Sequence, residues 1–258
     1  MDKSRLDTLF DVRERVAIVT GGTRGIGRAI AEGLVSGGAK VAVGSRKAEA
    51  CAETEAHLRA LGGEAFGMAT HMGDLDGAQR LVDRTLDRFG GVDIVVNNAA
   101  NALTQPLGAF TPEAWQKSFD VNLRGPVFLV QAALPSLERS AHASIINVIS
   151  AGAFLFSANV AMYSAAKAGL MAFTRAMAAD FATRGNGIRV NALAPGTVDT
   201  DMVRANTPEM QRAMANASFM RRAAHPDEMV GPALFLASDA SSFMTGQVLL
   251  VDGGLTPH

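Results

Sequence analysis

Residues 16–27 read VAIVTGGTRGIG: a run rich in β-branched residues, then a glycine-rich turn, then the start of a segment with helical period. Glycine lets the backbone turn sharply and approach a ligand closely, and a helix N-terminus attracts negative charge through its free N–H groups. A strand before the glycines and a helix after them distinguish a phosphate-binding turn from an ordinary tight turn. We therefore predict that a pyrophosphate group binds here, in contact with Gly21, Thr23, Arg24, Gly25, Ile26 and Gly27.

The same alternation continues along the chain, where short β-branched runs are followed by longer segments of helical period. It is typical of βαβ units and of a parallel sheet covered by helices on both faces. We expect strands at Val16–Thr20, Val41–Ser45, Ala65–Thr70, Ile94–Asn97, Ser144–Ile149, Arg189–Ala194 and Val248–Val251. Helices are expected at Ile26–Ser36, Glu49–Leu61, Gly77–Phe89, Thr111–Leu137, Ala161–Thr183 and Asp227–Ala237. No linker, charge block or repeat marks a boundary, so the sequence predicts one doubly wound α/β domain over residues 1–258.

Composition excludes several classes of protein. Apolar residues make up 48% and charged residues 19% of the 258, which is the balance of a globular chain and not of a disordered or fibrous one. The formal net charge of −1 leaves no positive excess to neutralise the phosphates of a nucleic acid. One stretch without formal charge, between Arg139 and Lys167, contains polar residues throughout and indicates core, not a membrane span.

The number of cysteines and the spacing of the histidines favour a reducing compartment and a protein without a metal site. The single cysteine, Cys51, cannot form an internal disulfide or supply a Cys-based metal site. The five histidines are scattered without ligand spacing. We expect a cytoplasmic protein that needs no bound metal and acts on a small molecule.

The residue at the end of the second predicted strand distinguishes the two nicotinamide dinucleotides, because a carboxylate there would bond the ribose hydroxyls and repel a 2′-phosphate. Ser45 occupies this position and Arg46 follows it, while Arg24 lies within the glycine turn. Two guanidinium groups that converge on a phosphate make strong charge-assisted hydrogen bonds. We therefore predict NADP(H) as the cofactor, with Glu49 close enough along the chain to weaken the preference over NAD(H).

Tyr163 and Lys167 lie four residues apart in a segment of helical period, so their side chains emerge on one helix face. A phenol has a pKa near ~10, and an adjacent cation favours the phenolate and lowers that value. Ser150 ends the fifth predicted strand, where doubly wound sheets place their ligand crevice, and its hydroxyl can hold a substrate oxygen beside Tyr163. This pattern predicts proton transfer between the phenol and a substrate oxygen.

These motifs resemble those of the short-chain dehydrogenase/reductase family, in the family's order and over nearly the whole chain. The residues that carry the resemblance are T-G-x-x-x-G-x-G at 20–27, Asp93, Asn97-Asn98-Ala99, Asn122, Ser150, Tyr163, Lys167, Asn191, Pro195-Gly196 and Asp252-Gly253-Gly254. The resemblance implies a single Rossmann-type domain with a seven-stranded parallel sheet, commonly assembled as a homotetramer. It also implies transfer of hydride between a nicotinamide and an alcohol or carbonyl carbon.

The resemblance further implies roles for individual residues. Tyr163 looks like the general acid and base, Lys167 like the group that lowers its pKa and holds the nicotinamide ribose, and Ser150 like the residue that orients the substrate oxygen. Asn122 would hold a water that links Lys167 to solvent, and Asp93, Asn97 and Asn191 would brace the sheet and loops. The remaining cofactor contacts it implies are Ser45, Arg46, His71, Met72, Asn98, Ala99, Pro195, Gly196, Val198 and Thr200.

Three positions depart from the family pattern. Ile149 stands where the family commonly has a second serine before the crevice, which leaves the catalytic Ser150 in place. Ala100 stands where the family usually has a glycine that passes close to the nicotinamide ribose. His71 stands where the family usually has an aspartate that contacts adenine, which leaves either another polar contact or a surface histidine without a role.

Two segments of the sequence bear on the substrate, namely residues 200–224 and the turn after Ser150. Residues 200–224 are rich in methionine and arginine and are typical either of one or two packed surface helices or of a mobile flap over a pocket. The turn from Ala151 to Phe156 either forms an opposing apolar wall, which favours an apolar or extended carbonyl compound, or fills core. A 3-oxoacyl-carrier-protein reductase is an alternative, with Arg139 or Arg184 as candidates for docking an acidic carrier. The alternative from another class is a dinucleotide-binding sensor or scaffold that has lost catalysis.

Overall fold

The computed structural model describes residues 8–155 and 158–256 of the chain. Within those residues the strands form one parallel sheet of seven, in the order β3-β2-β1-β4-β5-β6-β7. β1 pairs with both β2 and β4, so the strand order reverses on either side of β1. Ligands of doubly wound sheets bind outside the carboxyl ends of the strands at such a switch point. The predicted parallel α/β sheet is confirmed.

Each strand begins and ends within one residue of the bounds expected from the sequence. The strands are β1 (Val16–Thr20), β2 (Lys40–Ser45), β3 (Ala65–Ala69), β4 (Ile94–Asn97), β5 (Ser144–Val148), β6 (Arg189–Pro195) and β7 (Val248–Val251). Their continuous apolar runs reflect burial on both faces, which is the usual situation in a parallel sheet.

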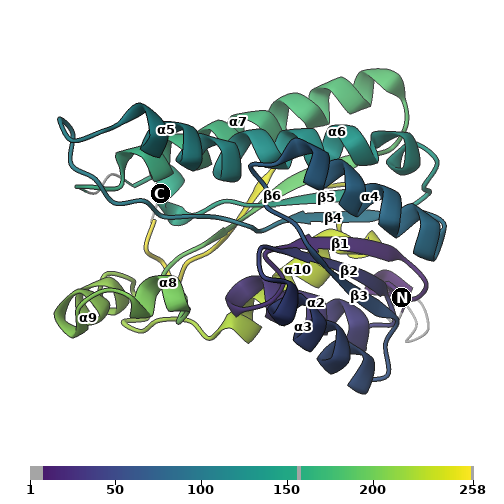
Figure 1. Ribbon diagram of the computed structural model, residues 1–258, viewed down its shortest axis with the longest axis horizontal. Coiled ribbons are helices and arrows are strands. Elements are labelled where there is room, and N and C mark those ends of the chain that lie inside the picture. The colour runs from purple at the N-terminus through teal and green to yellow at the C-terminus, as the bar shows by residue number, and fades with distance from the viewer. Residues whose placement is uncertain (1–7, 156–157, 257–258) are drawn as a thin grey trace.

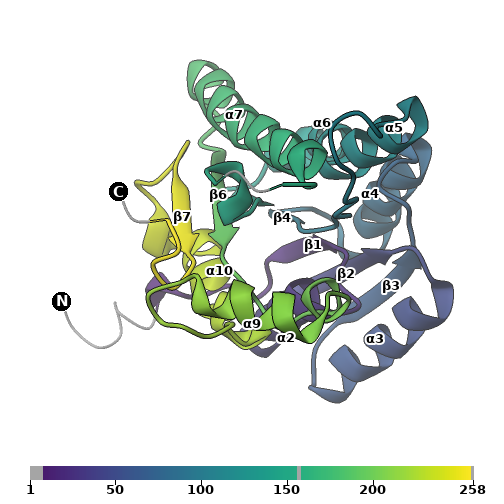
Figure 2. The same cartoon turned by 90° about the vertical axis from the view of Figure 1, so that its left-hand side faces the viewer.

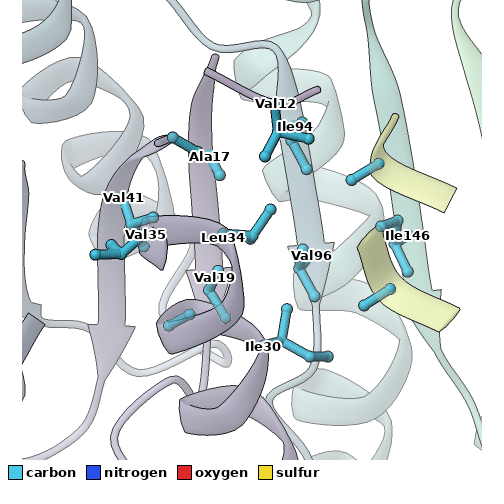
Figure 3. Packing of buried hydrophobic residues seen from close by; sticks show 14 of the residues in the cluster. Val12, Ala17, Val19, Ile30, Leu34, Val35, Val41, Ile94, Val96 and Ile146 are labelled. Atoms are coloured by element: carbon cyan, nitrogen blue, oxygen red, sulfur yellow. The ribbon is translucent and has the colours of Figure 1, made fainter. Parts of the chain in front are cut away.

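Helices cover the two faces of the sheet (Figure 1). On one face lie α4 (Leu75–Phe89), α6 (Gly125–Leu137) and α7 (Ala161–Arg184), and on the other lie α2 (Gly25–Ser36), α3 (Ala48–Ala60) and α10 (Val230–Ala237). Successive residues of β1 show how each face is filled. Val19 packs in one core cluster with Leu34 of α2, as Figure 3 shows, while Ile18 packs in the other with Leu81 of α4.

The long helix expected over residues 111–137 is interrupted. It begins as α5 (Pro112–Phe119), with Thr111 as the N-cap that accepts from the Ala114 N–H at 3.1 Å. It then widens into a π-helical turn, η1 (Asp120–Arg124), before it continues as α6. Pro126 lacks the N–H that an uninterrupted α-helix would donate to the carbonyl four residues earlier, which explains a break at this place.

The methionine-rich segment forms two short helices, α8 (Asp201–Arg204) and α9 (Pro208–Asn216). Neither helix buries a residue, and Met202 and Met210 are exposed. Figure 1 places both helices beyond the carboxyl end of β6, across from the beginnings of α5 and α7, and Figure 2 shows α9 on the same side of the molecule as α2. Among the described residues, no helix is long and apolar enough to cross a membrane.

Candidate active site

The glycine turn lies between β1 and α2, at the switch point of the sheet. Gly21 and Gly25 have φ values of +65° and +52°, a backbone conformation that side chains with a Cβ rarely adopt. A Cβ added at Gly21 would lie 2.9 Å from the Ala99 Cα, and one added at Gly27 would lie 2.3 Å from the Asn98 Nδ2. The turn therefore needs glycine for both its conformation and its close contact with the chain that leaves β4.

Hydrogen bonds join the end of β1 to the loop after β4. The Thr20 hydroxyl accepts from the backbone N–H groups of Asn98 at 3.0 Å and Ala99 at 3.1 Å. The Asn98 side chain in turn donates to the carbonyls of Thr20 at 2.9 Å and Gly21 at 3.2 Å. Two segments expected to contact the cofactor are thus held against each other by the threonine that begins the motif.

The polar groups expected to select the dinucleotide gather at the end of β2. The Thr23 hydroxyl donates to the Ser45 hydroxyl at 2.9 Å, and no carboxylate occupies the end of the strand. Arg46 is exposed and makes no ion pair with the described residues. Arg24, by contrast, is paired with Asp201 at the start of α8, with 3.1 Å between Nη1 and Oδ2.

The side chains of His71 and Met72 lie in different environments. His71 is exposed at the carboxyl side of β3, and its Nδ1 accepts from the Gly73 N–H at 3.1 Å. It lines a hollow of about 670 Å³ between the start of α4 and α5. The Met72 side chain is buried in the core under α6, so only its backbone is left for a cofactor contact. Ser150, Tyr163 and Lys167 do not line this hollow. We place the active site at these three residues, because their side chains can transfer a proton.

Ser150, Tyr163 and Lys167 meet where β5 leads into α7. Ser150 caps the short helix η2 (Ala151–Ala153) by accepting from the Gly152 N–H at 3.0 Å. A Cβ added at Gly152 would lie 3.3 Å from the Ser150 hydroxyl and 3.8 Å from the Tyr163 ring, so both side chains border the same glycine. Lys167 is one helical turn beyond Tyr163 in α7, and its Nζ lies 5.8 Å from the centre of the tyrosine ring. The four-residue spacing places both side chains on one helix face, as predicted.

Burial sets the protonation of both groups. Burial raises the pKa of Tyr163 above its ordinary value, and the hydrogen bond with Ser150 opposes this shift. Burial lowers the pKa of Lys167 to about 8. The sequence predicted a phenol pKa lowered by Lys167, whereas in the structure the cost of burying a phenolate outweighs the opposing contribution from Ser150, so the pKa is raised. Tyr163 is therefore held in its protonated form, ready to donate.

The Lys167 ammonium has more N–H donors than the described residues use. The side chain is only 1% exposed, and within the described part of the chain its Nζ makes one hydrogen bond, to the Val148 carbonyl at 2.7 Å. An ammonium group has three hydrogens to donate. A buried cation with one protein partner fits a site that is completed by the hydroxyl groups of a bound ribose.

Asn122 lies in the π-helical turn η1 and is fully buried. Its Nδ2 donates to the Ser118 carbonyl and to the Asn101 carbonyl, both at 2.9 Å, and its Oδ1 accepts from the Asn101 N–H at 3.1 Å. Asn101, which the sequence analysis missed, also donates to the Lys117 carbonyl at 3.0 Å. The Asn122 side chain thus ties the loop after β4 to the turn, and its expected role in holding a water stays a prediction.

The segment after β6 closes over the glycine turn. A Cβ added at Gly196 would lie 2.7 Å from the Asp252 Cα, so glycine is needed where the chain passes the end of β7. Val198 is buried and pairs with Ala224 in an isolated bridge. A Cβ added at Gly25 would lie 3.0 Å from the Thr200 methyl group, so the two expected cofactor segments are in contact.

The three residues expected to brace the sheet do so. Asp93 accepts from the Val16 N–H at 2.8 Å, at the start of β1. Asn97 donates to the Asn147 side chain at 2.9 Å, and Asn191 donates to the Met244 carbonyl at 2.8 Å. Among residues 8–155 and 158–256, no group of three or more His, Cys, Asp or Glu side chains is arranged to hold a metal ion.

The residues present fit a nicotinamide dinucleotide. The glycine turn offers a backbone surface where a Cβ would intrude, and Lys167 offers unused donors deep in the crevice. The parallel sheet, this turn and the Ser150–Tyr163–Lys167 cluster define an α/β dinucleotide-binding oxidoreductase. A family model described as enoyl-(acyl carrier protein) reductase matches residues 21–256. Together with the relatives below, this match shows that the chain belongs to the short-chain dehydrogenase/reductase family.

Several relatives cover almost the whole chain. It is 38% identical over 244 residues to cis-4-hydroxycyclohexanecarboxylate dehydrogenase of Sinomonas cyclohexanicum, covering 94% of this chain and 97% of the relative. It is 37% identical over 246 residues to the 3-oxoacyl-(acyl-carrier-protein) reductase FabG of Vibrio cholerae serotype O1, covering 95% and 99%. A solved structure of 3-oxoacyl (acyl-carrier-protein) reductase from Agrobacterium tumefaciens C58 with NADP bound matches with a TM-score of 0.90 and 38% identity, covering 98% of each chain. The protein is therefore an oxidoreductase that acts on alcohol or carbonyl groups.

Proposed function

We propose that this chain is an NADP(H)-dependent oxidoreductase in which Tyr163 exchanges a proton with the oxygen of a carbonyl or secondary alcohol substrate. The observation that carries this proposal is the convergence of Ser150, Tyr163 and Lys167 after β5, at the same carboxyl edge of the sheet as the glycine turn after β1. When bound, the dinucleotide supplies or accepts the hydride at the substrate carbon.

Ser150, Tyr163 and Lys167 have different roles at the substrate oxygen. In reduction, the protonated Tyr163 donates to the oxygen as negative charge develops there, and the hydroxyl of Ser150 holds that oxygen in place. The Lys167 cation stabilises the phenolate that remains, while its unused donors hold the ribose. In oxidation, the same phenolate takes the proton back.

The other expected cofactor residues would act through backbone and polar contacts. The turn at 21–27 and the loop at Asn98 and Ala99 would surround the pyrophosphate and the ribose, and Pro195 to Thr200 would contact the nicotinamide carboxamide. Arg24, Ser45 and Arg46 favour NADP(H), because Arg46 is exposed without an ion partner among the described residues and no carboxylate stands at Ser45. NADP is bound in the similar Agrobacterium structure, which supports the same choice.

Initial rates with NADPH and NADH test the cofactor, measured against aldehydes, ketones, acyl-thioesters and keto-sugars by the absorbance of the reduced nicotinamide. We expect faster turnover with NADPH at equal low concentration. Tyr163→Phe should bind NADPH normally and lose at least ~10³-fold in turnover, because the proton donor is gone while the binding contacts remain. Ser164→Ala, which removes a neighbouring hydroxyl that has no hydrogen-bond partner in the described residues, is the matched control and should keep its turnover. Near-native turnover of Tyr163→Phe would remove the phenol from the mechanism.

The identity of the substrate separates a general carbonyl reductase from a 3-oxoacyl-carrier-protein reductase. The similarity to FabG of Vibrio cholerae favours the second candidate. The docking residues suggested by the sequence do not support it, since Arg184 ends α7 and lies about 30 Å along the helix from Tyr163. Arg184 also pairs with Glu138, beside Arg139, at that same far end. Reduction of a carrier-bound 3-oxoacyl group faster than the same group on a small thiol would favour this candidate.

We also propose a cytoplasmic homotetramer. Three neighbouring helices carry exposed aromatic side chains, namely Trp115 in α5, Phe128 in α6 and Phe173 in α7. Apolar surface of this kind is often covered by a partner. Light scattering on the eluting protein should give four times the chain mass, and a monomer would contradict the proposal. The single cysteine, Cys51, is buried, which suits a reducing compartment.

A further inference from the structure

The glycine turn and the segment after β6 are joined by an ion pair between residues 177 positions apart. Arg24, the residue before α2, places its Nη1 3.1 Å from Oδ2 of Asp201, the first residue of α8. Directly beside this pair, the Thr200 methyl group lies against Gly25. The carboxylate therefore contacts the arginine that the NADP(H) assignment gives to the 2′-phosphate.

Asp201 is the carboxylate of this segment that depends on Arg24. Asp199, two residues earlier, is held by Arg204 through two hydrogen bonds of 2.7 and 2.9 Å. The same Arg204 lies 3.8 Å from Asp201, beyond hydrogen-bond distance. Of these two arginines, Arg24 is therefore the closer to Asp201, and the Arg24 and Asp201 side chains are both more than half exposed.

From this geometry we propose that Asp201 competes with the 2′-phosphate of NADP(H) for Arg24, and so sets how strongly the protein prefers NADP(H) over NAD(H). This inference rests on the proposed cofactor. The guanidinium carries five N–H donors, and Asp201 occupies the Nη1 group. A phosphate that takes the edge formed by Nη1 and Nη2 in a bidentate contact displaces the carboxylate or shares Nη1 with it at lower strength. NAD(H) has a hydroxyl in place of the phosphate and does not require that the ion pair break.

The size of the effect follows from the exposure of the pair. Exposed ion pairs stabilise proteins by up to ~1 kcal/mol, which corresponds to about a fivefold change in an equilibrium constant. Asp201→Asn keeps the shape of the side chain and removes its charge. We expect this variant to bind NADP⁺ about two- to fivefold more tightly and NAD⁺ with unchanged affinity.

Dissociation constants for NADP⁺ and NAD⁺, measured by titration calorimetry on the intact protein without substrate, test the proposal. Asp199→Asn is the matched control, because it removes one carboxylate from the same segment while leaving the Arg24 pair in place. It should leave the ratio of the two constants unchanged. Equal gains for Asp199→Asn and Asp201→Asn would show a general charge effect and overturn the proposal, as would an unchanged NADP⁺ constant in Asp201→Asn.

The Arg24→Ala background separates competition from simple repulsion. Without the guanidinium, Asp201→Asn should no longer change the NADP⁺ constant, because nothing is left to compete for. A gain that persists in this background would mean that Asp201 repels the phosphate directly, and the competition would be wrong. Arg24→Ala alone should weaken NADP⁺ about tenfold or more with little effect on NAD⁺. If it does not, the NADP(H) assignment fails, whereas a failure of Asp201→Asn alone leaves that assignment intact.

Discussion

The ammonium of Lys167 donates to the Val148 carbonyl at 2.7 Å while its Nζ lies 5.8 Å from the centre of the Tyr163 ring. One hydrogen bond thus fixes the cation at the end of β5, under the phenol and away from solvent. The position stabilises a phenolate once it forms, yet the same burial disfavours both charged groups before the reaction begins.

The protonation of Tyr163 can be measured directly, because it is the only tyrosine of the chain. Burial raises the pKa of the phenol above its ordinary value of 10.0, so the ultraviolet band of the phenolate should appear only above pH 10.0 in the folded protein. The unfolded protein in guanidinium should titrate near ~10. Tyr163→Phe should show no band. A phenolate already present near neutral pH would show that the Lys167 cation outweighs burial.

Lys167 should destabilise the fold at neutral pH. Its pKa is about 8 in the folded protein against 10.5 unfolded, so between these values the unfolded chain binds more protons and stability rises with pH. Below pH 8 the full cost applies, at most about 3 kcal/mol. Lys167→Met should therefore raise the free energy of unfolding in urea at pH 7 by about 1–3 kcal/mol, since it also loses the bond to Val148. Turnover should be lost.

The control for Lys167→Met is pH itself. The stability advantage of the variant over the natural protein should shrink as the pH rises from 8 toward 10.5, because the natural lysine then becomes neutral in both states. A variant that is less stable at every pH would contradict the assignment of a strained, buried cation. Active-site groups often carry such a cost in stability.

Gly27 and Gly91 should respond in opposite ways to alanine. A Cβ at Gly27 would lie 2.3 Å from the Asn98 Nδ2 and 2.5 Å from the Gly21 carbonyl oxygen, so the turn must move. Gly27→Ala should lose about 1–3 kcal/mol of stability and most of its dinucleotide affinity. A Cβ at Gly91 would meet only the Ser136 hydroxyl, at 3.9 Å, and Gly91→Ala should be unchanged or more stable by up to ~1 kcal/mol. Unfolding midpoints and dinucleotide titrations check both, and normal binding by Gly27→Ala would contradict the close packing.

The sequence predicted the sheet and the Tyr163–Lys167 pair because both depend on local periodicity. It did not predict the π-helical turn, although Pro126 within the expected helix was a visible signal. The Arg24–Asp201 ion pair could not be predicted from the sequence, because the two residues are far apart along the chain and come together only in the folded protein. The direction of the Tyr163 pKa shift was wrong because spacing gives the neighbour of a group but not its burial.

Asn122 and Asn101 are hydrogen-bonded to each other, and we expect their alanine variants to differ in stability and turnover. Asn101→Ala keeps the backbone N–H and carbonyl that bond Asn122, and removes the side-chain contacts to the Asn122 Nδ2 at 3.2 Å and to the Lys117 carbonyl. Its loss in stability should be about 1 kcal/mol, with turnover within about twofold of the natural protein.

Asn122→Ala should cost more, because it leaves the Asn101 N–H and the Ser118 carbonyl without their buried partner. We expect a loss of about 1–3 kcal/mol, measured by urea unfolding, and at least about a tenfold loss of turnover as η1 loosens beside α7. If Asn122 also supports proton movement to Lys167, the loss in turnover during alcohol oxidation should deepen at low pH, because release of the proton to solvent is least favourable there. Equal losses of stability and turnover in Asn101→Ala and Asn122→Ala would show that Asn122 only stabilises the loop after β4.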